Sequence, residues 1–143
     1  MEAMSADART TRPPRDLQSW QQLPVSAIAN FHPVVIESLN PAEIQSTLKA
    51  HPFQRFPVAR NGILSGILTR KEAEAALAEN RAPKLEPAVT CLPSQNIRQL
   101  QSLLIESTSL LTVLVDRPNG KILGVVTLHD LLRAEVSLAK EGA

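Results

Sequence analysis

The chain has 143 residues, of which 43% are hydrophobic and 20% are charged, and its formal net charge is +1. This composition supports a globular core, excludes global disorder, and lacks the clustered basic charge of a nucleic-acid-binding surface. The sequence shows no signal-peptide pattern and no apolar run long enough to span a membrane. Cys91 is the single cysteine, which excludes an intramolecular disulfide. We therefore expect a soluble domain with no nucleic-acid partner.

The N-terminal segment differs in character from the rest of the chain. Residues 1–16 are polar, contain prolines and show no apolar period, which predicts a flexible tail or linker. Ordered structure is expected to begin at residues 17–20. Residues 23–29 are expected to form a short lead-in element before the first strand.

The remainder of the chain contains two copies of one unit. Residues 61–69 align without a gap with residues 119–127, and both copies contain an Asn-Gly pair, a later glycine and a final threonine. Upstream, the two copies align only if the two residues Arg117 and Pro118 are treated as an insertion in the second turn. Such self-similarity is the signature of a structural repeat, and insertions are best tolerated in turns.

Each copy predicts the same order of elements: a strand, a helix, a two-stranded hairpin and a second helix. Asn40 is a favourable cap for the first helix, and Asn61-Gly62 supplies the positive φ angles of a tight hairpin turn. In the first copy the predicted strands are 33–36, 56–59 and 64–68, and the predicted helices are 41–51 and 70–82. In the second copy the predicted strands are 88–91, 111–116 and 122–126, and the predicted helices are 95–107, behind a Ser94 cap, and 128–138.

The predicted fold class is α+β, with tandem β-α-β-β-α repeats that each contain a small sheet and two helices. One repeat cannot bury both faces of its sheet alone, so we expect the repeats to pack sheet against sheet as a pseudo-twofold pair with the helices outside. The predicted domains are 17–82, the lead-in with the first repeat, and 83–143, the second repeat.

Residues 124–132, with the sequence GVVTLHDLL, match a family signature: glycine, two apolar residues, threonine or serine, two variable residues and aspartate. On this basis the chain resembles a tandem CBS-domain pair, or Bateman module, over residues 23–138. The ending GVVTLHDLLRA and the lead-in at residues 17–25 are similar to the C-terminal cytosolic CBS region of bacterial voltage-gated chloride channel family proteins.

The resemblance implies a regulatory domain without catalytic activity. It implies that ATP, ADP or AMP binds as a regulatory ligand, with no cofactor required, and that CBS pairs associate into a homodimer. It further implies attachment to a membrane channel or proton/chloride antiporter, which places the domain in the cytoplasm at the inner membrane.

The signature has a physical logic for nucleotide binding. Thr127 is expected at the turn from a strand into a helix, where free backbone N–H groups favour phosphate, and the Asp130 carboxylate can accept hydrogen bonds from a ribose. Gly124 lacks a side chain, so a flat ring could approach its backbone. The expected nucleotide-binding residues are Thr127, Asp130, Gly124, the backbone of Val89, Thr90 and Cys91, and Val113 as an apolar wall of the cleft.

A purely structural interpretation stands beside this one, because Thr-x-x-Asp is also a helix capping box. The first repeat has Glu72 where the signature has aspartate, and the extra methylene moves the carboxylate away from the ribose position. Glu72 is therefore expected to close a capping box, and if only one site per chain binds nucleotide, it should be the one with Asp130.

Other function classes find little support in the sequence. His32, His51, His129 and Cys91 do not occur at the spacing of a metal site, and no catalytic motif is present. The apolar stripe Val125, Leu128, Leu131, Leu132 and Val136 predicts core or a dimer interface. Two alternatives stay open: a dimerisation module that binds no nucleotide, and the regulatory domain of another enzyme or transporter.

Overall fold

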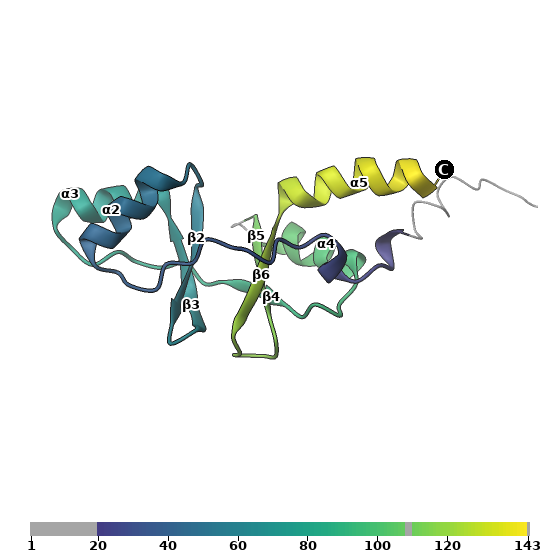
Figure 1. Cartoon of the computed structure of the whole chain (residues 1–143), viewed down its shortest axis with the longest axis horizontal. Coiled ribbons are helices and arrows are strands. Elements are labelled where there is room, and N and C mark those ends of the chain that lie inside the picture. Colours follow the sequence, from purple (N-terminus) through teal and green to yellow (C-terminus); the bar gives the residue numbers. More distant parts are fainter. Residues whose placement is uncertain (1–19, 108–109, 143) are drawn as a thin grey trace, which may run out of the picture.

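The computed structural model describes residues 20–107 and 110–142, and the surroundings of side chains as far as residue 137. The predicted tail at residues 1–16 lies outside this range. Two small sheets face each other at the centre, and pairs of helices lie on their outer sides (Figure 1). This arrangement matches the predicted α+β architecture. Among the described residues, no helix is both long and apolar enough to cross a membrane.

The first repeat is built on an antiparallel hairpin. It contains α2 (Pro41–Ala50), β2 (Arg55–Arg60), β3 (Ile63–Thr69) and α3 (Arg70–Glu79). Asn61 and Gly62 have φ angles of 55° and 81°, as the predicted turn requires. The Asn40 side chain accepts a hydrogen bond from the Ala42 N–H, which confirms the predicted cap of α2.

The predicted strand at residues 33–36 is wrong in extent. Only Ile36 pairs, through a parallel bridge to Val58 in which its N–H donates to Pro57 O and its carbonyl accepts from Ala59 N. Pro33 cannot donate a hydrogen bond to a sheet, which limits the length of pairing here.

The second repeat contains β4 (Val89–Cys91), α4 (Ile97–Glu106), β5 (Leu111–Val115), β6 (Ile122–Thr127) and α5 (Leu128–Gly142). β4 is parallel to β5, and β5 is antiparallel to β6, so the three strands form one sheet with β5 in the middle. The second hairpin turn has Asn119 at a φ of 60°. The predicted strands of this repeat are confirmed to within one residue.

Three helix ends differ from prediction by more than one residue. α4 begins at Ile97 behind an Asn96–Gln99 capping box, so Ser94 is not its cap. α3 ends at Glu79 because Asn80 adopts a left-handed conformation, with a φ of 52°, that stops the helix. α5 continues to Gly142, beyond the predicted end at residue 138.

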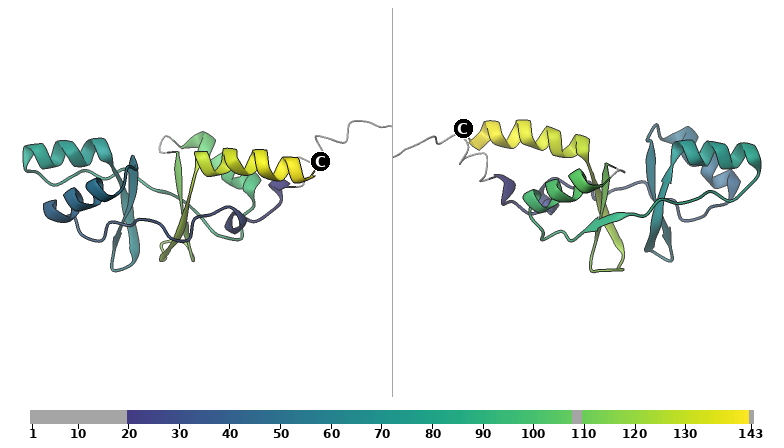
Figure 2. Two further views of the ribbon diagram at one scale, coloured as in Figure 1. Left: turned by 45° about the horizontal axis from the view of Figure 1, so that its top comes forward. Right: turned by 180° about the vertical axis from the view of Figure 1, so that it is seen from behind.

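Each repeat receives a segment that precedes the other repeat (Figure 2). The lead-in, which includes the 3-10 turn η1 (Val25–Ala27), exchanges two hydrogen bonds of 2.9 Å between Asn30 and Val125 of β6. In the same way, Glu86 exchanges bonds of 2.8 and 2.9 Å with Ile67 of β3. The lead-in therefore packs with the second repeat, a contact that its place in the sequence does not reveal.

The buried side chains of the described residues form three clusters. One fills the helix side of the first sheet around Phe56, and another fills the helix side of the second sheet around Trp20, Val25 and Leu114. The third lies between the two sheets and contains Ile67, Leu111, Val113, Val115 and Val125. This shared cluster explains why neither sheet is left with an exposed apolar face.

Candidate functional site

The junction of β6 and α5 contains the two signature residues in direct contact. The Thr127 Oγ1 accepts a hydrogen bond of 3.1 Å from the Asp130 N–H, and the Asp130 Oδ2 accepts one of 2.9 Å from the Thr127 N–H. This is the reciprocal capping box that the structural interpretation predicted. Asp130 is half-buried. Its Oδ1 makes no hydrogen bond within the part of the chain that the structure describes. The helix cap therefore uses one carboxylate oxygen, and the other can still accept a hydrogen bond.

Leu110 is a residue of this junction that the sequence did not reveal. Its carbonyl accepts a hydrogen bond of 3.1 Å from the Leu128 N–H at the start of α5, and its side chain is 45% exposed. Its φ angle of 56° is rare for a bulky residue and indicates local strain. Gln54 makes the equivalent bond to Arg70 in the first repeat without a positive φ angle. No sequence signal marks this conformation, because leucine does not favour it.

The predicted residues of β4 lie in the same sheet as the junction. Val89 pairs with Thr112 and Thr112 with Val126, so the start of β4 is two strands, about 10 Å, from the end of β6. Thr90 is exposed and Val89 is half-buried. Cys91 is 3% exposed, and this burial raises the pKa of its thiol to about 11. Its side chain is therefore a protonated core group, and only its backbone remains a candidate contact.

Two predicted positions are filled by the protein itself. Val113 is fully buried in the cluster between the sheets, so it forms core rather than an open wall of a cleft. A Cβ added to Gly124 would stand 2.5 Å from the Asn30 carbonyl oxygen, so the close approach that this glycine permits is made by the lead-in backbone. Gly66 has the same relation to Glu86, at 2.9 Å. Both glycines thus have a structural role that needs no ligand.

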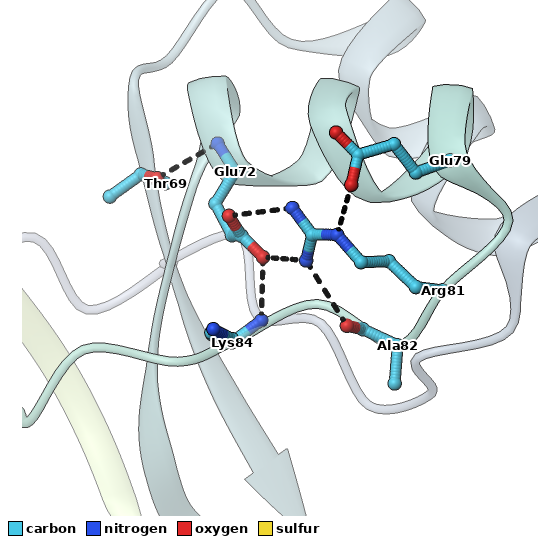
Figure 3. A network of polar contacts seen from close by, with 6 residues as sticks. All are labelled: Thr69, Glu72, Glu79, Arg81, Ala82 and Lys84. Atoms are coloured by element: carbon cyan, nitrogen blue, oxygen red, sulfur yellow. Dashed lines mark hydrogen bonds and ion pairs between the residues drawn. The ribbon is translucent and has the colours of Figure 1, made fainter.

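The first repeat uses its acid differently (Figure 3). Thr69 caps α3 by accepting a hydrogen bond of 3.1 Å from the Glu72 N–H, but the Glu72 carboxylate does not return to the cap. It accepts bonds of 2.5 and 3.3 Å from the Arg81 guanidinium and one of 2.8 Å from the Lys84 N–H. The predicted capping box at Glu72 is therefore wrong: the longer side chain reaches the connection between the repeats.

The electrostatics agree with this geometry. The Arg81 guanidinium, followed by the Lys84 N–H, lowers the pKa of Glu72 to about 2. The hydrogen bonds that Arg81 donates to Glu72 and then to Glu79 raise the pKa of Arg81, whose Nε lies 2.7 Å from Glu79 Oε1. The acid of the first repeat is therefore ionised and fully engaged by groups of its own chain.

The helix side of the second repeat carries a groove of about 580 Å³. It lies between α4 and α5, and the Gln21–Gln101 side-chain hydrogen bond of 2.8 Å joins two of the residues that line it. None of the seven predicted site residues lines this groove. Among the described residues, no group of three or more His, Cys, Asp or Glu side chains could hold a metal ion.

Comparison with known proteins identifies the fold. Residues 85–137 match the family model of the CBS domain, and no curated protein sequence matches the chain. The CBS domain of a bacterial CNNM/CorC family Mg²⁺ transporter in complex with ATP is 18% identical, with a TM-score of 0.68 over 88% of this chain and 95% of that one.

Two further solved structures are similar. A CBS domain protein from Shewanella oneidensis MR-1 is 25% identical, with a TM-score of 0.64 over 77% of this chain and 94% of that one. The CBS domain pair of protein MJ0100, in complex with 5′-methylthioadenosine and S-adenosyl-L-methionine, is 21% identical, with a TM-score of 0.64 over 78% and 98%. The chain therefore has the fold of a CBS domain pair, and its second repeat matches the CBS family model.

Proposed function

We propose that the chain is a regulatory CBS-domain pair that binds an adenine nucleotide at the second repeat. The observation that carries this proposal is the β6–α5 junction, where Asp130 is held at a helix N-terminus with one carboxylate oxygen still available. Three ligands in the similar structures, ATP, 5′-methylthioadenosine and S-adenosyl-L-methionine, all contain adenosine. An adenosine-containing ligand is the chemistry that these residues suit.

Each group at the junction has a distinct task in this proposal. The positive dipole end of α5 favours phosphate, and Asp130 Oδ1 accepts a hydrogen bond from a ribose hydroxyl. Backbone groups of Val89, Thr90 and Cys91 read the adenine edge, and the exposed Leu110 side chain offers an apolar contact to the base. The first repeat binds no nucleotide, because Glu72 is engaged by Arg81 and Lys84.

The ligand acts by binding one arrangement of the parent protein more tightly than another, since equal affinity for both would shift nothing. The parent that we propose is a membrane transporter, with this domain on the cytosolic face of the inner membrane. The sequence resemblance points to a chloride channel or proton/chloride antiporter. The adjacent coding sequence tests this, because it would encode the membrane domain.

Calorimetric titration of the chain with ATP, ADP and AMP tests the nucleotide site. One site per chain is expected, and Asp130→Asn, which keeps a capping oxygen but removes the charge, should weaken binding about tenfold. Asp116→Asn is the matched control, because Asp116 also accepts a backbone N–H but lies in the distant hairpin turn. Absence of binding by any of the three nucleotides at millimolar concentration would overturn the proposal.

A second function, homodimer formation, is favoured by a separate observation. Ile105, Leu132 and Val136 on α4 and α5 are 84%, 51% and 67% exposed, whereas no large hydrophobic side chain described on α2 or α3 is exposed. The predicted apolar stripe is thus divided: Val125 and Leu131 are core, and Leu132 and Val136 remain outside. Light scattering should show a dimer that Leu132→Lys disrupts and that Leu123→Lys, at a β6 site with 37% exposure, leaves intact.

A further inference from the structure

Several residues of the connection between the repeats make hydrogen bonds or packing contacts before β4 begins. The Lys84 N–H donates to Glu72, and the Leu85 side chain packs against the core of the first repeat. Glu86 pairs with Ile67 in both directions, and Ala88 packs between the sheets. β4 begins at the next residue, Val89. The connection, residues 80–88, is therefore an ordered segment, called the strap below. It leads from α3 directly to β4, the strand proposed to contact the adenine.

Glu72 is the side chain of α3 that holds the start of this strap. Its carboxylate accepts two hydrogen bonds from Arg81 and one from the Lys84 backbone, across distances of 2.5 to 3.3 Å. Asp130 occupies the corresponding position of the second repeat, but its shorter side chain bonds to its own cap. The two acids thus differ by one methylene group: Asp130 caps its own helix, whereas Glu72 reaches the backbone twelve residues later in the chain.

We propose that Glu72 is a positioning residue for the ligand site of the second repeat, because it holds the strap that places β4. This inference rests on the proposed function. Because the strap is already ordered in the free protein, ligand binding does not carry the cost in conformational entropy of ordering it. The affinity for the ligand is therefore higher even though Glu72 does not contact the ligand. The first repeat thereby contributes to a site that it does not itself form.

An ordinary surface ion pair would not have this effect, because exposed pairs contribute little. The Glu72 carboxylate differs in that it accepts a backbone N–H, which is a charge-assisted bond to the main chain of the strap. Glu79 provides the contrast within the same helix. Its side chain is 62% exposed and bonds to the Arg81 Nε, and it makes no bond to the backbone of the strap.

The test compares Glu72→Ala with Glu79→Ala in the full chain, since both remove an acid of α3 that binds Arg81. In Glu72→Ala, amide hydrogen exchange in residues 84–91 should accelerate, and the dissociation constant of ATP should rise about tenfold, as expected for losing one charge-assisted hydrogen bond. In Glu79→Ala both quantities should stay within about twofold of wild type. Glu72→Gln should recover part of the protection, because its amide oxygen can still accept from Lys84.

Each outcome supports or contradicts either the positioning role of Glu72 or the ligand site. Equal exchange of β4 in the two alanine variants overturns the positioning role, and so does faster exchange with unchanged ATP affinity. If the wild-type chain binds no adenine nucleotide, the proposed function fails, but the exchange comparison still shows whether Glu72 holds β4. If Asp130→Asn weakens binding and Glu72→Ala does not, the ligand site stands and the positioning role of Glu72 fails.

Discussion

The two repeats share their hairpins, their helix order and their exchanged segments, but they differ at the start of the last helix. In the second repeat Asp130 bonds back to Thr127, and in the first repeat Glu72 bonds forward to Arg81 and Lys84. The threonine cap is common to both. A duplicated fold can thus keep the residues that build its helices while the acid beside each cap takes a different partner.

The cores of the repeats differ as well. Phe56 and Thr112 occupy the same place in their hairpins, since Phe56 pairs with Leu68 and Thr112 with Val126. Both side chains are fully buried. The large ring fills the core of the first repeat, whereas the core of the second repeat contains Trp20 from the lead-in. The large aromatic side chain in the core of the second repeat therefore comes from the exchanged segment.

The largest expected effect comes from the core of the first repeat. Phe56→Ala should lower the free energy of unfolding by about 3 to 5 kcal/mol, because it removes a fully buried ring and leaves a cavity. Urea denaturation followed by circular dichroism measures this loss. Thr112→Ala at the equivalent place is the matched variant, and an equal loss there would contradict the difference between the cores.

The next largest loss of stability is expected at the two glycines that contact the exchanged segments. Gly124→Ala should cost about 1 to 3 kcal/mol, because the new methyl group meets the Asn30 carbonyl and backbone cannot easily move aside. Gly66→Ala should cost less, since its closest backbone contact is 2.9 Å rather than 2.5 Å. Thermal unfolding of the two variants ranks them. A larger loss in Gly66→Ala would show that the strap yields less readily than the lead-in.

A smaller and opposite effect is expected at Thr112. Its hydroxyl is buried with no hydrogen-bond partner among the described residues, so Thr112→Val should raise the free energy of unfolding by about 1 kcal/mol. Denaturant titration measures the gain. Loss of stability instead would indicate that the hydroxyl has a partner, such as an ordered water, that the apolar side chain cannot replace.

The smallest effect concerns the pH dependence of the strap. The pKa of Glu72 falls from its ordinary value of 4.5 to about 2 in the folded chain. Its contribution to stability is therefore complete above pH 4.5 and is lost as the pH falls from 4.5 toward 2. Denaturation of wild type and Glu72→Gln at pH 7, 5 and 3 should show a stability difference that is nearly the same at pH 7 and 5 and clearly smaller at pH 3, which approaches the folded-state pKa of about 2. A difference that stays constant across this range would contradict the lowered pKa.

Much of the fold could be predicted from local patterns. The Asn61-Gly62 turn, the Asn40 cap and the strands of the second repeat follow from preferences that act within a few residues. The contact between Thr127 and Asp130 could be predicted as a capping box, whereas their role in ligand binding stays a prediction. The conformation of Leu110 could not be predicted, because leucine itself disfavours a positive φ angle.

The sequence by itself determined the repeat, the order of its elements and the CBS resemblance, because these depend on residue type and spacing along the chain. Only the tertiary structure decided that Asn30 pairs with Val125 and Glu86 with Ile67. It also decided that Glu72 leaves its own cap for Arg81. The physical reason is the same in each case: these partners are chosen by which backbone and side-chain groups the folded chain brings within bonding distance. No preference of a single residue specifies that choice.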